Sequence, residues 1–107
     1  MSADASETIW HITTDGTPAK PGAEPFVHAS FTSQVAGSLE KHYAEALSVE
    51  LLRLDPDALG ESLVVEPSRG GALFPHVYAE IPDAAIVERK TFTRENAATP
   101  FDLSGLG

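Results

Sequence analysis

The sequence predicts a small single domain of the α+β class with a largely antiparallel sheet. About six short runs of β-prone residues can be distinguished, while only one stretch has the period of an amphipathic helix. Strands and helices do not alternate regularly, which argues against a doubly wound parallel sheet. No G-x-G-x-x-G follows a predicted strand, and this disfavours a dinucleotide fold of the Rossmann type.

The first part of the chain holds two predicted strands and a long loop. Residues 1–8 are small and polar, and we expect them to form a mobile tail. The first strand is Ile9–Thr13, in which β-prone residues follow one another. Gly and Pro then mark Asp15–Pro25 as a loop, and Phe26–Ser30 is the second strand.

One helix is predicted over roughly residues 32–46. Thr32 or Ser33 is expected to cap its N-terminus by accepting a hydrogen bond from a free backbone N–H. Its apolar side chains recur four residues apart and form a single stripe. These side chains are Val35, Leu39, Tyr43 and Leu47.

Four more strands follow the helix, separated by residues that favour turns. Asp55–Gly60 is a predicted turn, and Ser68–Gly71 is a flexible turn or an anion-binding loop. Pro75 is expected to lie at an edge, a bulge or the entry of its strand. Residues 9–92 thus form the predicted core, and residues 93–107 a C-terminal tail. The four strands are Val49–Leu54, Leu63–Glu66, Phe74–Ile81 and Ala85–Phe92.

Composition limits the classes of function. The 107 residues include seven Lys+Arg and sixteen Asp+Glu, for a formal charge of -9, so nucleic acid is an unfavourable partner. The chain has no cysteine, which excludes disulfides, thiolate metal sites and a cysteine nucleophile, and fits a reducing cytoplasm. No apolar run approaches the ~18–20 residues of a membrane helix, and no secretory signal precedes the first strand. We therefore expect a cytoplasmic domain without a membrane partner.

The histidines are the most informative residues. Three of the four lie in predicted strands, where side chains alternate between two faces. In each strand the histidine shares its face with aromatic, hydroxyl or aliphatic groups, while the other face is apolar or small. If the plain faces line the core, the mixed faces can line one cleft suited to a polar organic ligand. The mixed faces are Ile9–His11–Thr13, Phe26–His28–Ser30 and Phe74–His76–Tyr78.

Each histidine also has a structural interpretation, as a ring hydrogen-bonded inside the fold. His42 is expected to be a solvated or half-buried helix residue. A metal site made by His11, His28 and His76 is disfavoured, because their spacing matches no metal motif. Ser30 lies near His28, but no G-x-S-x-G nucleophile elbow is present, so a serine hydrolase is disfavoured.

Two charged residues lie beside the last predicted turn. Glu66 ends its strand and is either a solvated carboxylate or a group that accepts a proton or stabilises developing positive charge. Arg69 precedes two glycines, and glycine lets a phosphate or carboxylate approach the backbone while arginine binds the oxyanion. Both residues are candidates for the same site as the histidines.

Four blocks of this sequence resemble the domain of unknown function 952 family. The most specific block runs from Glu66 to Tyr78, and the next is F-V-H-A-S, followed by Gln34-Val35. The resemblance covers roughly residues 9–92. In full, the blocks are I-W-H-I-T, F-V-H-A-S, L-L-R-L-D and V-V-E-P-S-R-G-G-A-L-F-P-H-V-Y.

The resemblance implies a fold like those of ADP-ribosyltransferases and tRNA 2'-phosphotransferases, with two curved, mostly antiparallel sheets enclosing a cleft for NAD. By that resemblance, His11 contacts the cofactor ribose, and Ser30 with His28 frames the nicotinamide. Glu66 or His76 polarises the reacting ribose. The Pro/Gly-rich loop is shorter than is usual in the family, so we expect a cleft that is more open at one side or is shaped for a different ligand.

Three functions remain open from the sequence. The first is an enzyme that uses NAD as cosubstrate, with His11, His28, Glu66 and His76 in catalysis. Ligand contacts would then come from His11, Ser30, Arg69 and Tyr78, with no metal. The second is a non-catalytic module that binds a nucleotide-like or other small polar ligand, and the third is a structural or partner-binding domain.

Overall fold

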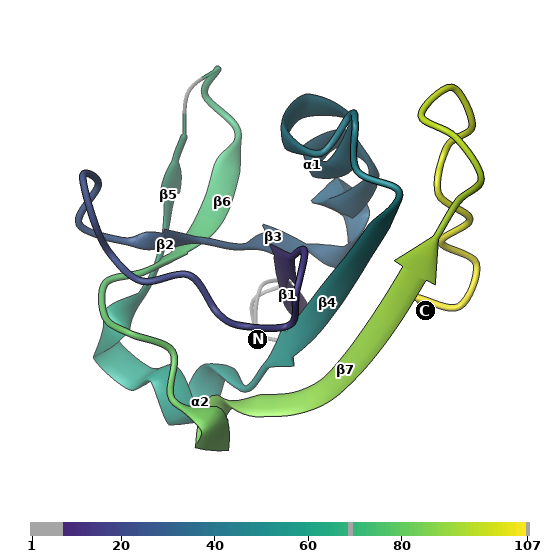
Figure 1. Ribbon diagram of the computed structural model, residues 1–107. Coiled ribbons are helices and arrows are strands. Elements are labelled where there is room, and N and C mark those ends of the chain that lie inside the picture. Colours follow the sequence, from purple (N-terminus) through teal and green to yellow (C-terminus); the bar gives the residue numbers. More distant parts are fainter. Residues whose placement is uncertain (1–7, 69, 107) are drawn as a thin grey trace.

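The computed structural model describes residues 8–68 and 70–106, and the fold is α+β (Figure 1). The α-helices are α1 (Val35–His42) and the one-turn α2 (Pro56–Leu59). Short 3₁₀ turns occupy Thr32–Gln34, Gly60–Ser62 and Asp83–Ala85. The strands are β1 (Ile9–Thr13), β2 (Val27–His28), β3 (Ser30–Phe31), β4 (Ser48–Leu54), β5 (Leu63–Pro67), β6 (Leu73–Val77) and β7 (Ile86–Thr93).

These strands form two antiparallel sheets. One is four-stranded in the order β3-β1-β4-β7, and the other is three-stranded in the order β2-β6-β5. The predicted small α+β domain with antiparallel sheets and one main helix is confirmed. β1 has the predicted bounds, β4 and β5 differ from theirs by one residue at one end, and β7 is shifted by one residue at both ends. Within the described ranges, no helix is long and apolar enough to cross a membrane.

The single strand predicted over residues 26–30 is wrong. The segment divides into β2 and β3, which belong to different sheets and are separated by Ala29. The Ala29 N–H donates to the Pro75 carbonyl at 3.0 Å, but proline has no N–H to return the bond. The ladder between β2 and β6 therefore ends here, and the chain crosses to the other sheet (Figure 1).

Pro75 is not at an edge, a bulge or a strand entry, as the sequence suggested. It lies in the middle of β6, the central strand of its sheet, in a continuous register with Val65. A proline is tolerated there because the residue opposite its missing N–H, Ala29, lies beyond the end of β2, so the ladder needs no hydrogen bond at this position. β6 itself stops at Val77, so the prediction of a strand reaching Ile81 is also wrong.

The predicted helix is too long at its C-terminal end. A 3₁₀ turn covers the first three residues, and α1 then ends at His42 instead of residue 46. The Arg94 guanidinium caps this end, because it donates to three carbonyls in the segment that follows His42. Its acceptors are the carbonyls of Tyr43 at 3.1 Å, Ala44 at 2.7 Å and Ala46 at 2.8 Å.

The predicted N-cap of this helix is also wrong. Thr32 Oγ1 accepts the indole N–H of Trp10 at 2.8 Å, so it fixes a core side chain and not a helix end. Gln34 Oε1 instead accepts the Phe31 N–H at 3.0 Å. The predicted turn after β4 contains α2, whose N-cap Asp55 accepts from the Asp57 N–H at 3.0 Å.

Two hydrophobic clusters cover opposite faces of the four-stranded sheet. The first lies between the sheets and joins Leu52 to Val27 and Val77. The second joins Leu51 to α1 and to the segment after β7, where Phe101 and Leu106 are buried. Because Val27 and Val77 face the first cluster, their neighbours His28 and His76 project from the other face of the three-stranded sheet.

Candidate functional site

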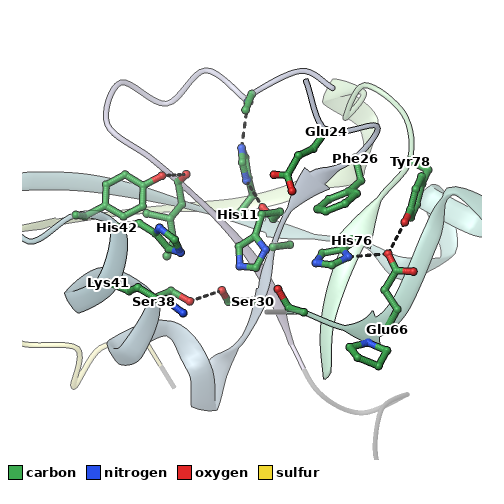
Figure 2. Close-up of a pocket in the computed structure, with 17 residues that line it drawn as sticks. His11, Glu24, Phe26, Ser30, Ser38, Lys41, His42, Glu66, His76 and Tyr78 are labelled. Atoms are coloured by element: carbon green, nitrogen blue, oxygen red, sulfur yellow. Dashed lines mark hydrogen bonds and ion pairs between the residues drawn. The ribbon is translucent and has the colours of Figure 1, made fainter. Parts of the chain in front are cut away.

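An open cleft of about 980 Å³ lies between the three-stranded sheet, α1 and the loop that follows β1 (Figure 2). All four histidines of the chain line it, from β1, β2, α1 and β6. The register explains part of this convergence, because His28 and His76 are direct partners across β2 and β6. Glu66 is paired with Phe74, so it is the diagonal neighbour of His76 on the same face.

His11 is held by backbone groups on both sides of its ring. Its Nε2 accepts the Ala19 N–H at 3.0 Å, so the proton lies on Nδ1, which donates to the His28 carbonyl at 2.9 Å. The ring is 5% exposed, and burial lowers its pKa, against a smaller opposing effect of the bond to the His28 carbonyl. His11 therefore lies in the wall as a neutral ring that joins the loop, β1 and β2.

Glu66, His76 and Tyr78 form a hydrogen-bonded cluster at the other side of the cleft (Figure 2). His76 Nδ1 donates to Glu66 Oε2 at 2.7 Å, and the Tyr78 hydroxyl donates to the same oxygen at 2.5 Å. The Tyr78 bond and then the His76 bond lower the pKa of Glu66, and the bond to Glu66 raises the pKa of Tyr78. Glu66 is therefore an ionised carboxylate at neutral pH.

The cluster leaves one nitrogen of His76 unused. A carboxylate can only accept, so Nδ1 carries the proton and Nε2 is the basic atom. His76 is 2% exposed, and Nε2 is buried without a hydrogen-bond partner among the described residues. The Phe26 ring stacks on it, with centroids 3.9 Å apart and an interplanar angle of 14°. A buried polar atom without a partner is costly, which marks Nε2 as a group kept for another purpose.

His28 lies among the other imidazoles. Its ring centroid is 5.5 Å from that of His76 and 6.1 Å from that of His42. Burial, followed by the nearby His76, His42, His11 and Lys41, lowers the pKa of His28 from 6.5 to about 4. His28 is therefore neutral at pH 7 and accepts a proton only when negative charge or acid is added.

The cleft has two chemically different ends, which Figure 2 shows at the two sides of the view. At one end lie Phe26 and Tyr78 with the carboxylates of Glu24 and Glu66. At the other end lie residues of α1, namely Ser38, Lys41 and His42. Ser30 lies between the ends and shares a hydrogen bond of 2.9 Å with Ser38. A ligand with a cationic or aromatic part and a separate anionic part matches this polarity.

The structure brings together most of the residues predicted for the site. His11, His28, Ser30, Glu66, His76 and Tyr78 all line the cleft, whereas Arg69 lies outside the described residues. Within the described residues, no group of three His, Asp or Glu side chains is arranged so that it could hold a metal ion. Sequence reasoning missed the α1 residues Ser38 and Lys41 and gave His42 no place in a site. Their spacing of three and four residues was the available signal, because it puts them on one helix face.

Comparisons with known proteins agree with the fold. The model of the family described as "Protein of unknown function (DUF952)" matches residues 4–89. The crystal structure of protein CC0527 from Caulobacter crescentus superimposes with a TM-score of 0.77 and 22% identity, covering 92% of this chain and 96% of that one. Its solution NMR structure gives 0.74 and 24%, covering 92% and 95%. No curated protein matches this sequence.

Proposed function

This chain belongs to the DUF952 family of proteins of unknown function, and we propose that it binds NAD or another ADP-ribosyl compound in the histidine cleft. The ligand class comes from the resemblance to ADP-ribosyltransferases. The observation that carries the proposal is the polarity of the cleft, with carboxylates and aromatic rings at one end and Lys41 at the other. NAD has the matching arrangement, since its nicotinamide is a cationic ring and its pyrophosphate is anionic.

The acidic end suits the nicotinamide ring. Phe26 and Tyr78 are tilted toward each other, with ring centroids 5.4 Å apart, and offer aromatic faces for stacking. The Glu66 carboxylate stays ionised beside them, and it is in reach of the developing positive charge when the ring leaves. The Glu66 carboxylate thus attracts the positive charge of nicotinamide, and the aromatic rings offer faces on which its flat ring can stack.

The residues also support cleavage of the bond between nicotinamide and ribose. That C–N bond breaks with its electron pair on nicotinamide, and an oxocarbenium-like ribose results, which Glu66 stabilises. Water or an acceptor hydroxyl then adds to the ribose carbon and loses its proton to His76 Nε2. Glu66 holds His76 in the tautomer that can take this proton. In this scheme His11 positions the wall, because backbone groups occupy both of its nitrogens.

One observation favours a binding module without catalysis. The basic nitrogen of His76 is buried, and the Phe26 ring is stacked on the imidazole. A proton acceptor must come within hydrogen-bond distance of the reacting group, so catalysis requires Phe26 to move aside. If Phe26 keeps its place when ligand binds, the cleft binds the compound and leaves it intact.

The test is a ¹⁵N-HSQC titration with NAD⁺ and with ADP-ribose, followed by an assay for released nicotinamide. Both ligands should shift resonances of His28 and Ser30, and only NAD⁺ should shift those of Phe26 and Tyr78. Glu66→Gln should weaken NAD⁺ about tenfold more than ADP-ribose, because it removes a charge from the nicotinamide end. Glu61→Gln is the matched control, since Glu61 is exposed in the turn before β5.

The three outcomes have separate meanings. Shifts with nicotinamide release support the enzyme, and release should then be lost in Glu66→Gln but kept in Glu61→Gln. Shifts without release support the binding module. No shifts at millimolar concentrations of either ligand would overturn the proposed ligand class.

A further inference from the structure

A second cavity of about 240 Å³ adjoins the cleft, between α1 and the hairpin of β5 and β6. Five residues line both cavities, namely His28, Ser38, Lys41, His42 and Ser68. Gly37 and Phe74 line only the second one. A water molecule occupies about 30 Å³ in the liquid, so this space holds a small polyatomic ion with part of its hydration.

The charge of this cavity is opposite to that of the chain. None of the described residues that line it is acidic, although the whole sequence carries a formal charge of -9. Among the described residues, Arg53, Arg89 and Lys90 each lie within 4.0 Å of a glutamate, but no carboxylate lies that close to Lys41. The Lys41 ammonium is thus available to an anion from outside the chain.

Hydrogen-bonding groups surround the same space on two sides. Ser33 and Ser38 come from the helical segment, and Ser68 comes from the end of the hairpin turn. Gln34 fixes the distance between the two sides, because its Nε2 donates to the Leu73 carbonyl at 2.7 Å. Hydroxyls beside an ammonium, from more than one direction, suit a tetrahedral oxyanion with several acceptor oxygens.

We propose that this second cavity is an oxyanion subsite that takes a phosphate group, with Lys41 as its charged partner and serine hydroxyls as donors. The inference goes beyond the proposed function, since it does not require NAD to bind in the cleft. The phosphate belongs either to a separate phosphorylated molecule or to an extra phosphate on the nucleotide itself. The chemistry of the subsite is the same in both cases.

The neighbouring His28 ring gives a readout of this binding. Burial comes first among the causes that hold its pKa near 4, and repulsion from neighbouring basic groups adds to it. These groups are His76 on β6, His42 and Lys41 on α1 and His11 on β1, while Glu24 and Glu66 are the carboxylates that line the same cleft. An anion at Lys41 offsets the charge of its ammonium, so the pKa of His28 should rise when phosphate binds.

The full chain is titrated with inorganic phosphate and, as a separate control, with chloride, both at the same constant ionic strength. Resonances of Gly37, Lys41 and Phe74 should shift with phosphate and not with chloride. Lys41→Gln should weaken binding about five- to tenfold. Lys20→Gln is the matched control, because Lys20 is also exposed but lines neither cavity.

A second variant tests whether phosphate binds in the second cavity, and it leaves the charge of Lys41 unchanged. A Cβ at Gly37 would meet no atom within 4 Å, so Gly37→Leu can fold and fill the second cavity with its side chain. It should abolish phosphate binding and leave the NAD⁺ shifts of the cleft unchanged. Phosphate shifts that survive both Gly37→Leu and Lys41→Gln, or no phosphate shifts at tens of millimolar, would overturn the proposal.

Combined titrations identify the source of the phosphate and separate the two proposals. If phosphate and NAD⁺ bind together, the subsite takes a separate phosphorylated molecule. If a nucleotide with an extra phosphate, such as NADP⁺, displaces phosphate while NAD⁺ does not, the subsite takes that extra group. If NAD⁺ itself displaces phosphate, Lys41 serves the pyrophosphate of the cleft ligand, and a separate subsite is rejected. Phosphate binding without any NAD⁺ binding would support the subsite and reject the proposed function of the cleft.

Discussion

Two buried histidines lie in different walls of the same cleft, and they differ in how their nitrogens are used. In the β1 wall, His11 has backbone partners at both nitrogens. In the β6 wall, His76 has Glu66 at Nδ1 and no partner among the described residues at Nε2. Both residues are almost fully buried, at 5% and 2% exposure.

The difference shows that burial alone does not identify a functional histidine. The ring of His11 uses its hydrogen-bonding capacity to tie the loop to the sheet, which is a structural role. The ring of His76 keeps an acceptor without a partner, which costs stability and is retained most readily where a ligand can use it. The β1 wall should therefore respond to substitution mainly in stability, and the β6 wall mainly in ligand chemistry.

The largest expected effect is on stability in the β1 wall. His11→Leu keeps the volume but leaves the Ala19 N–H and the His28 carbonyl without partners in a buried place. We expect a loss of about 3 kcal/mol in the free energy of unfolding, because each buried unpaired group costs about 1–3 kcal/mol. Urea denaturation measures it, and His42→Leu on the exposed helix face is the control, within about 0.5 kcal/mol of the natural chain. Equal losses in the two variants would contradict the structural role of His11.

Acid should weaken the same wall without any substitution. Both His11 and His28 have lowered pKa values in the folded chain, so the unfolded chain binds protons more readily. Their stabilising effect is complete above pH 6.5 and is lost as the pH falls, for His28 as the pH approaches its pKa of about 4. Protonating His11 Nε2 also destroys its bond from the Ala19 N–H.

For His28 we expect a loss on the order of 2 kcal/mol between pH 7 and pH 4, after discounting for the exposed part of its ring. Thermal unfolding across this range measures the total loss. The part above pH 4.5 isolates the histidines, because the Glu66 carboxylate, with its lowered pKa, contributes only below that value. A midpoint of unfolding that is constant from pH 7 to pH 5 would contradict this prediction.

The sequence was sufficient to predict the alternation that forms the site. The parity of F-V-H-A-S and F-P-H-V-Y put His28 and His76 on faces opposite to Val27 and Val77, and the structure has this arrangement. This prediction succeeds because successive side chains of a strand point to opposite faces, whichever strand pairs with it. It also works where β2 is only two residues long, since Phe26 and Ser30 still line the cleft.

The ends of the elements and the roles of the two histidines depended on contacts between segments that are distant in the sequence. The end of α1 is capped by Arg94, which is about fifty residues away along the chain, and the break at Ala29 is set by Pro75. The two roles of His11 and His76 depend on which backbone group or carboxylate reaches each nitrogen. No local pattern contains that information, because it arises only when the sheets and the loop pack together.

A substitution in the β6 wall should remove function with little change in stability. His76→Phe removes the buried Nε2 and the Nδ1 bond to Glu66, and it retains a flat ring against Phe26. We expect the free energy of unfolding to change by less than about 1 kcal/mol, because removal of the unpaired buried atom offsets the lost bond to a carboxylate that water can reach. The NAD⁺ shifts at Phe26 and Tyr78, and any nicotinamide release, should be lost. A loss of stability as large as that of His11→Leu would show that the two walls are equivalent.

The smallest expected effect is a change in the pKa of Glu66. The Tyr78 hydroxyl is the main cause that lowers this pKa, and Tyr78 is 40% exposed, so Tyr78→Phe removes the donor without disturbing the core. The pKa of Glu66 should rise toward its ordinary value of 4.5, as followed by NMR of the ¹³C-labelled carboxyl group. Tyr43→Phe is the control, because that hydroxyl donates to the Ile12 carbonyl and does not contact Glu66.

If both variants leave the pKa of Glu66 unchanged, Tyr78 is only a wall of the cleft. A rise in the Tyr78 variant alone shows that the Tyr78 hydroxyl keeps the Glu66 carboxylate ionised, so an exposed ring controls the charge of the group that holds His76 Nδ1.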